Sequence, residues 1–154
     1  MLTEAERHQI ARESRQYPHK RAACLQALKI VQEREGWVSD EDLEAVAGCL
    51  DMTPAELDAV ATFYNLIFRK PVGRHVILLC DSISCWVMGC TQLQTHFKSH
   101  QQLELGKTSA NGRFTLLPIV CLGACDRAPA MMVDHEIYGN LTPENIDEIL
   151  EQFE

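Results

Sequence analysis

At 154 residues, the chain is long enough for one ordinary domain or two small ones. Its hydrophobic fraction of 46% and charged fraction of 23% are typical of a soluble globular protein. The formal net charge of −8 argues against a nucleic-acid partner, because phosphate binding needs a basic surface. No run approaches the ~18 consecutive apolar residues of a membrane span, so we expect no direct membrane insertion.

The start of the chain predicts two helices. Thr3 and Glu6 have capping-box spacing and open a polar helix that ends near Tyr17-Pro18. The next helix covers residues 19–35, and Gly36 fits its C-terminal cap. Charges from the fourth residue onward are unlike a secretory signal, so we expect the seven cysteines of the chain to be in a reducing compartment.

Two further helices follow before residue 70. Ser39 caps the third, and Thr53-Pro54 together with Glu56 combines a capping residue, a first-turn proline and a capping-box glutamate for the fourth. Apolar residues at helical spacing give the core candidates of this region. They are Ala23, Leu28, Val31, Leu43, Val46, Ala47, Leu50, Leu57, Val60 and Ala61.

The segment Lys70–Gly73 breaks the helical pattern with a proline and a glycine. We therefore divide the chain into residues 1–72, a helical bundle, and residues 73–154, a second domain. The apolar run at residues 75–79 predicts a buried strand that ends at Cys80, and residues 86–97 return to helical spacing.

The rest of the second domain reads as four short strands and a helix. Asn111-Gly112 is a strong hairpin signal, so residues 107–110 and 113–118 should pair as antiparallel strands. Residues 130–133 and 137–141 form another expected pair, and Thr142-Pro143 caps a last helix. The fold class is therefore α+β.

Two close cysteine pairs are the most informative feature of the sequence. Cys80 and Cys85 form a C-x4-C pair, Cys121 and Cys125 form a C-x3-C pair, and 35 residues separate the inner two. Each pair follows a predicted strand. If those strands are neighbours in one sheet, four thiols converge at one edge. Such soft ligands favour zinc or an iron–sulfur cluster.

The spacing favours iron and sulfide over zinc. Structural zinc sites commonly use C-x2-C, which neither pair has. A Rieske centre would need two histidine ligands, and no histidine adjoins either pair. Two other interpretations stay open: a zinc-stapled interaction module, and buried cysteines that only pack.

Three cysteines remain outside the pairs. Cys24 and Cys49 lie on predicted helices and are interpreted as core residues. Cys90 adds a second C-x4-C step, but it shares a predicted helical face with Trp86 and Phe97, which favours packing. A thiol–disulfide exchange role is a further alternative, which the absence of a C-x-x-C motif weakens.

Five segments resemble one protein family. They are ATFY (61–64), PVGRHVI (71–77), LCDSISC (79–85), GRFTLLP (112–118) and CLGACDRAP (121–129). In these segments, and over nearly its whole length, the chain resembles the E subunit of bacterial NADH:quinone oxidoreductase, respiratory complex I. The resemblance implies a four-helix N-terminal bundle followed by a thioredoxin-like 2Fe-2S ferredoxin domain.

The resemblance also implies a function and a ligand set. It implies one 2Fe-2S cluster, held by Cys80 and Cys85 on one iron and by Cys121 and Cys125 on the other. The cluster would accept single electrons from the FMN of an NADH-binding flavoprotein subunit, alongside other peripheral-arm subunits. This chain alone would not turn over NADH, since it lacks G-x-G-x-x-G. The complex would hold it on the cytoplasmic side of the inner membrane.

Two questions remain open at this stage. Similar small subunits serve NAD-linked hydrogenases and formate dehydrogenases, so the parent complex has an alternative. The apolar residues between Phe63 and Phe68 are interpreted either as core between the domains or as a patch that the flavoprotein buries.

Overall fold

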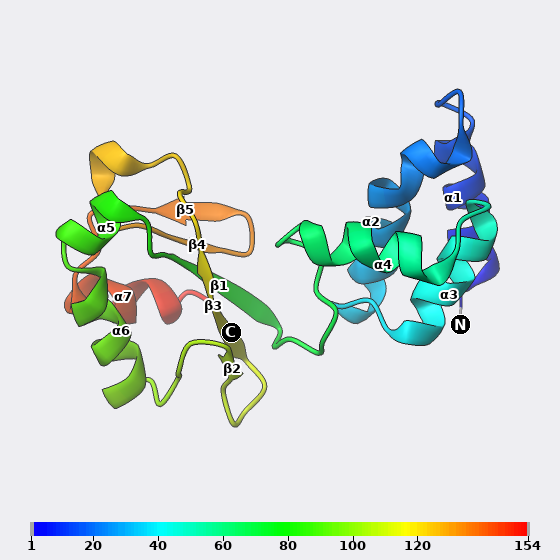
Figure 1. The fold of residues 1–154 in the computed structure, drawn as a ribbon. Helices are drawn as coiled ribbons and strands as arrows, with labels where there is room; N and C mark the ends of the chain where they lie inside the picture. The colour runs from blue at the N-terminus through cyan, green and yellow to red at the C-terminus, as the bar shows by residue number, and fades with distance from the viewer. Residues whose placement is uncertain (1, 154) are drawn as a thin grey trace. The chain divides into compact units, whose positions relative to one another are not determined.

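The computed structural model describes residues 2–153, which divide into two compact units. The first unit ends at Pro71 and the second begins at Val72. Figure 1 shows the helices and strands of both units. Each unit has its own hydrophobic core, and the two cores have no residue in common.

The first unit is helical, and local capping signals set where its helices begin. Thr3 and Glu6 make the predicted capping box, as do Thr53 and Glu56, while Ser39 accepts a hydrogen bond from the N–H of Asp42. The segment predicted to start a helix at residue 19 instead opens with a 3-10 turn. The helices are α1 (Glu4–Ser14), η1 (Lys20–Ala23), α2 (Cys24–Glu35), α3 (Asp40–Cys49) and α4 (Pro54–Phe63).

The core of the first unit contains the predicted apolar residues. All ten candidates are buried except Val60, which is partly buried and packs against the others. Gly36 ends α2 at a φ of 77°, a left-handed conformation that glycine adopts without steric cost. The predicted C-terminal cap is therefore confirmed.

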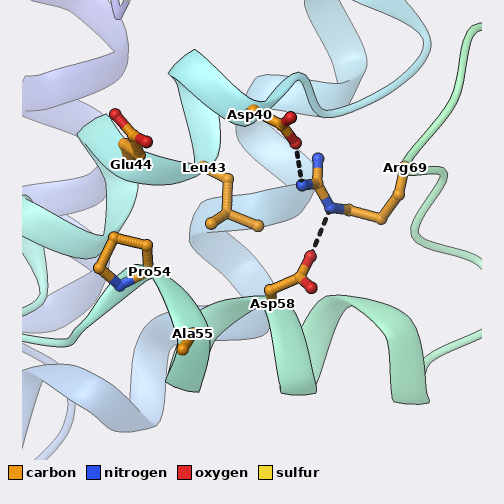
Figure 2. Close-up of a pocket in the computed structure, with 7 residues that line it drawn as sticks. All are labelled: Asp40, Leu43, Glu44, Pro54, Ala55, Asp58 and Arg69. Carbon is orange, nitrogen blue, oxygen red and sulfur yellow. Dashed lines mark hydrogen bonds and ion pairs between the residues drawn. The ribbon is translucent and has the colours of Figure 1, made fainter.

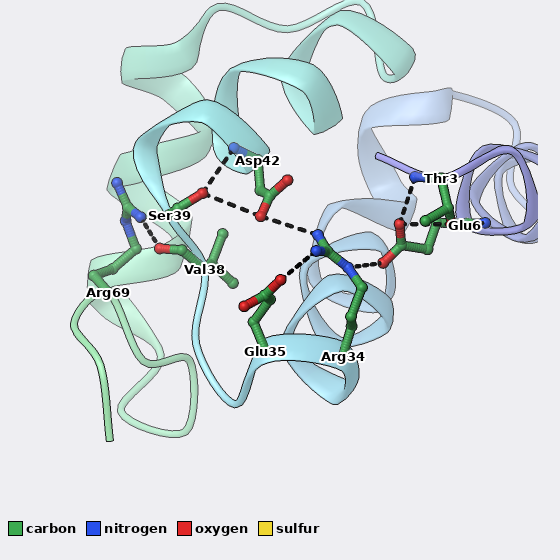
Figure 3. A network of polar contacts seen from close by, with 8 residues as sticks. All are labelled: Thr3, Glu6, Arg34, Glu35, Val38, Ser39, Asp42 and Arg69. Atoms are coloured by element: carbon green, nitrogen blue, oxygen red, sulfur yellow. Dashed lines mark hydrogen bonds and ion pairs between the residues drawn. The ribbon is translucent and has the colours of Figure 1, made fainter. Parts of the chain in front are cut away.

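Arg34 joins three helices of the first unit through one guanidinium group (Figure 3). From α2 its Nε donates to Glu6 Oε1 of α1 over 2.8 Å, and its Nη2 donates to Asp42 Oδ2 of α3 over 3.1 Å. Burial opposes ionisation of both carboxylates, but hydrogen bonds outweigh it. The pKa of Glu6 is lowered by Thr3 and Arg34, and that of Asp42 by Ser39 and Arg34, among other groups.

A second arginine of the first unit also links two helices through ion pairs. Arg69 Nη2 lies 2.6 Å from Asp40 Oδ1, and its Nε lies 2.8 Å from Asp58 Oδ1, so it joins α3 to α4 (Figure 2). These residues line a pocket of about 300 Å³ that also contains Leu43, Glu44, Pro54 and Ala55. The pocket contains no cysteine.

The second unit is built on a five-stranded sheet in the order β2-β3-β1-β4-β5. Only β1 and β3 run parallel; the other neighbours are antiparallel, including the two predicted strand pairs. The strands are β1 (His75–Cys80), β2 (Lys107–Thr108), β3 (Phe114–Ile119), β4 (Met131–Val133) and β5 (Glu136–Tyr138).

The continuous helix predicted over residues 86–97 is wrong. Gly89 has a φ of 104° and divides the segment into α5 (Ile83–Val87) and α6 (Cys90–Ser99). The break rotates Trp86 away from the face of Cys90 and Phe97, and its side chain is 63% exposed. A left-handed residue cannot continue a right-handed helix, whatever the apolar periodicity around it.

Helices α6 and α7 (Pro143–Leu150) complete the core of the second unit. His96 Nε2 of α6 lies 2.8 Å from Asp147 Oδ1 of α7, and Gln101 donates to the same oxygen over 2.8 Å. None of the helices within residues 2–153 has the length and apolar character needed to cross a membrane.

Replacing Arg34 with methionine should lower the free energy of unfolding of the first unit by about 2 kcal/mol, because two largely buried carboxylates lose a charged partner. Urea titrations followed by circular dichroism measure the loss. Arg12→Met is the matched control. The Arg12 side chain is 73% exposed and its Nε lies 3.8 Å from Glu13, so this change should cost less than ~0.5 kcal/mol. An equal loss of unfolding free energy in Arg34→Met and Arg12→Met would contradict the role of Arg34 in stabilising the first unit.

Acid should weaken the same network. Glu6 and Asp42 have folded-state pKa values below their ordinary 4.5 and 3.8, so their ionised forms stabilise the fold above those values. That contribution should be lost progressively as the pH falls from about 4.5 through the lowered pKa values. The urea midpoint of the native chain should therefore drop more steeply over this range than that of Arg34→Met. Parallel pH profiles of the two proteins would show the prediction wrong.

Candidate metal centre

The parallel pairing of β1 with β3 brings the two cysteine-bearing loops together. In this register Cys80 lies opposite Ile119, so both strands end at the same edge of the sheet. The N–H of Asp81 donates to the carbonyl of Ile119 over 3.1 Å and joins the first residues of the two loops. The prediction that these strands are neighbours is confirmed.

The first cysteine pair is buried beneath α5. Cys80 is the last residue of β1, and Cys85 lies in α5 after the short turn at Asp81-Ser82. The two side chains are hydrogen-bonded to each other, and each is at most 2% exposed. Burial, and then the neighbouring Cys80 thiol, raise the pKa of Cys85 to about 11. A metal that binds this pair must displace its protons.

The second pair is exposed. Cys121 Sγ and Cys125 Sγ are 3.3 Å apart across a tight loop that ends in η2 (Cys125–Arg127). Gly123 has a φ of 81°, and its N–H lies 3.4 Å from Cys121 Sγ. This N–H and the Cys125 thiol lower the pKa of Cys121, whereas Cys121 raises the pKa of Cys125.

The two pairs meet through α5. The Ser84 side chain hydrogen-bonds to Cys125, and Cys80 lies close enough to contribute to the raised pKa of the same thiol. Across residues 2–153, no group of three or more His, Cys, Asp or Glu side chains is gathered tightly enough for a single metal ion. The observed arrangement is two adjacent thiol pairs. This donor set fits a 2Fe-2S cluster, which takes four cysteine thiolates.

The backbone near Gly139 supports the second loop, and the sequence analysis missed it. The N–H of Asn140 donates to the carbonyl of Arg127 over 2.5 Å. A Cβ on Gly139 would lie 2.6 Å from Arg127 Cβ and 2.7 Å from the Arg127 carbonyl oxygen, so only glycine fits. A glycine inside a predicted strand signals such a close backbone approach, and this signal was present in the sequence.

The other cysteines lie outside this arrangement. Cys90 begins α6 and is 1% exposed within the core, as predicted. Burial raises its pKa, and Gln94 Nε2 lies 3.7 Å from its sulfur. Cys24 and Cys49 are partly buried against the core of the first unit, in agreement with their interpretation as packing residues.

Curated relatives match the chain nearly end to end. The E subunit of NADH-quinone oxidoreductase from Escherichia coli (strain K12) is 46% identical over 152 residues, which are 99% of this chain and 92% of the relative. The protein of the same name from Salmonella typhimurium has the same identity and coverage. The Pseudomonas aeruginosa protein of that name is 43% identical over 153 residues, with the same coverage of both chains.

The fold also has a solved counterpart. In the crystal structure of an NAD+-reducing NiFe hydrogenase in the air-oxidized state, one chain matches with a TM-score of 0.72 and 24% sequence identity. The match covers 85% of this chain but only 22% of the hydrogenase chain, and at this identity it bears on the fold alone.

A family profile agrees with these relatives. The profile described as thioredoxin-like 2Fe-2S ferredoxin matches residues 10–154. The mixed sheet and the paired cysteines at its edge lie within that range. The chain therefore belongs to the thioredoxin-like 2Fe-2S ferredoxin family, together with the E subunits of NADH-quinone oxidoreductase.

Proposed function

We propose that the chain is the electron-transfer subunit of an NADH:quinone oxidoreductase, with Cys80, Cys85, Cys121 and Cys125 as the ligands of one 2Fe-2S cluster. The observation that carries the proposal is the meeting of the two thiol pairs at one edge of the sheet. The names of the relatives at 43–46% identity support the parent complex.

In this proposal the buried and the exposed cysteine pairs have different roles. When bound, a 2Fe-2S cluster supplies one-electron redox chemistry. Cys80 and Cys85 would hold the cluster from the interior, where both side chains are buried away from water. Cys121 and Cys125 bind from the surface, and this exposed side is the one that an electron donor can approach. In our proposal that donor is the FMN of the NADH-binding flavoprotein subunit.

Hydrogen-bond donors around the exposed pair hold its negative charge. The N–H of Gly123 points to Cys121, and the side chain of Ser84 bonds to Cys125. Donors to coordinating sulfur stabilise the thiolate and orient it. The position of this pair therefore depends on the conformation of the loop around Gly123 and on contact with α5.

We assign the two parts of the chain different roles. Residues 73–154 are the thioredoxin-like cluster domain, and residues 1–72 are a four-helix bundle that docks to the flavoprotein and other peripheral-arm subunits. Phe63, Tyr64 and Leu66 support the docking role, because their large apolar side chains are exposed. The complex places the chain on the cytoplasmic side of the inner membrane, and NADH turnover belongs to the partner.

Replacing any one of the four proposed cysteine ligands with alanine should prevent the cluster from being held, since a 2Fe-2S centre needs four protein ligands. Anaerobically purified variants should lose iron and acid-labile sulfide together. They should also lose the electron paramagnetic resonance signal that the native protein shows after dithionite.

Cys90→Ala is the matched control for these variants. Cys90 is as deeply buried as Cys85, but it is packed in the core, so this variant should keep its iron, sulfide and signal. Loss of the cluster in Cys90→Ala with retention in one of the four ligand variants would overturn the ligand set. A colourless native protein that contained zinc would overturn the function.

Gly139→Ala should destabilise the cluster without removing a ligand. The new Cβ would force the Arg127 backbone, two residues beyond Cys125, away from its present position. We expect several-fold faster bleaching by an iron chelator and a shifted paramagnetic resonance spectrum.

Gly48→Ala is the matched control for this change. Gly48 is an exposed residue of α3 with no atom within 4 Å of an added Cβ. This variant should keep the native bleaching rate and gain roughly 0.5–1 kcal/mol in helix stability. Native bleaching in Gly139→Ala would show that this glycine does not position the loop.

A further inference from the structure

The two exposed thiols lie close enough to react with each other. Cys121 Sγ and Cys125 Sγ are 3.3 Å apart, whereas the bonded sulfurs of a disulfide are about 2.05 Å apart. Both cysteines belong to one short loop, so the remaining gap of about 1.2 Å is closed by rotation of two exposed side chains. The C-x3-C pair therefore has the geometry that a disulfide requires.

The loop has room for this closure. Neither thiol is part of the core of the second unit, so joining them displaces no packed side chain. Gly123 lies between the two cysteines with a φ of 81°, and an added Cβ would find no atom within 4 Å. A glycine in open space gives the backbone of the loop freedom to adjust as the sulfurs approach each other.

The other cysteines of the chain are shielded. Cys80, Cys85 and Cys90 are at most 2% exposed, and Cys24 and Cys49 are partly buried against the core of the first unit. Cysteine oxidation is selective for accessible sulfur. A dissolved oxidant therefore reaches the exposed pair before any other thiol.

The oxidation balances with hydrogen peroxide as the oxidant. Cys121 Sγ lies 3.4 Å from the nitrogen of Gly123, whose N–H donates to it, so Cys121 is the expected attacking thiolate. It attacks one peroxide oxygen, the O–O bond breaks, hydroxide leaves, and Cys121 becomes a sulfenic acid. The Cys125 sulfur then attacks the Cys121 sulfur, the S–O bond breaks, and water leaves. The two thiols have lost two electrons and two protons, and one peroxide has become two waters.

We propose that Cys121 and Cys125 are a redox modification site. In the cluster-free chain they form a reversible disulfide, which a dithiol reductant must open before all four proposed ligands are available. The consequence for assembly rests on the proposed function, whereas the disulfide itself rests on the geometry of the loop. A resolving thiol beside the sulfenic acid stops oxidation short of the irreversible sulfinic acid. Transient, redox-sensing disulfides are the kind that occurs in reducing compartments.

Mass spectrometry of the cluster-free full chain tests the modification. An iron chelator removes the cluster anaerobically, and far-ultraviolet circular dichroism confirms that the chain stays folded. The tryptic peptide 114–127 carries both thiols and no other cysteine. After hydrogen peroxide and then iodoacetamide, this peptide should lack two hydrogen atoms and carry no alkyl group, and dithiothreitol should restore both thiols. A peptide that is fully alkylated after peroxide, or a bridge to another cysteine, would overturn the proposal.

Single variants distinguish a paired site from general oxidation. In Cys121→Ser the Cys125 sulfur has no resolving partner, so the same peptide should accumulate sulfinic acid several-fold above the native level. Cys90→Ala is the matched control, because it also removes one cysteine, but a buried one, and it should form the disulfide as the native chain does. Equal amounts of sulfinic acid in the native chain and in Cys121→Ser would likewise contradict the paired site.

Cluster transfer tests the consequence for assembly. A 2Fe-2S-loaded scaffold protein serves as the donor, anaerobically and without added thiol, and visible circular dichroism follows the transfer. The reduced chain should accept the cluster and the oxidised chain should not, because two of its four proposed ligands are joined to each other. Dithiothreitol should restore transfer to the oxidised chain. Equal transfer to both forms would show that the disulfide does not control assembly.

The outcomes separate this inference from the proposed function. If peptide 114–127 stays reduced while the four alanine variants lose their clusters, the disulfide is overturned and the function stands. If the disulfide forms but Cys121→Ala or Cys125→Ala keeps its cluster, the proposed ligand set is overturned together with the control of assembly, and the modification stands.

Discussion

The parallel pairing of β1 with β3 is the constraint on which the rest of the second unit depends. Parallel neighbours need a crossover, here supplied by α5, α6 and β2, and their carboxyl ends necessarily share one edge of the sheet. The register that sets Cys80 opposite Ile119 then brings together two loops that are far apart in the sequence. A shift of one residue would turn Cys80 to the opposite face of the sheet and separate the pairs.

The same edge explains why the two pairs differ in exposure. Cys80 ends the central strand, where every residue from Val76 onward is buried, and Cys85 is the buried residue of α5. Cys121 and Cys125 lie in the loop beyond the end of β3, where both side chains are exposed. The buried cysteine pair is fixed by the surrounding core, and the exposed cysteine pair can be reached by another protein.

Local signals made much of the fold predictable, and long-range backbone contacts account for what was missed. Thr3, Ser39 and Thr53 act within one helical turn, so the sequence around them was enough to place three helix starts. The cysteine spacing after two strands predicted that the two thiol pairs meet at one sheet edge, because strand ends are local too, and the resemblance to the family supplied the proposed ligand set. Gly89 was missed because apolar periodicity continued across it, and Gly139 because its constraint comes from Arg127, which is distant in sequence. The exposure of Trp86 was missed for the same reason as the helix break at Gly89.

The two separate cores have a consequence for how the chain is made. The helical core draws only on residues up to Ile67, so all of its members are synthesised before the two cysteine pairs, and the unit has what it needs to fold first. The second core needs Ile146 and Leu150 of α7, which follow the two cysteine pairs in the sequence. The sheet edge that brings the two thiol pairs together therefore gains its full core only once α7 has been synthesised.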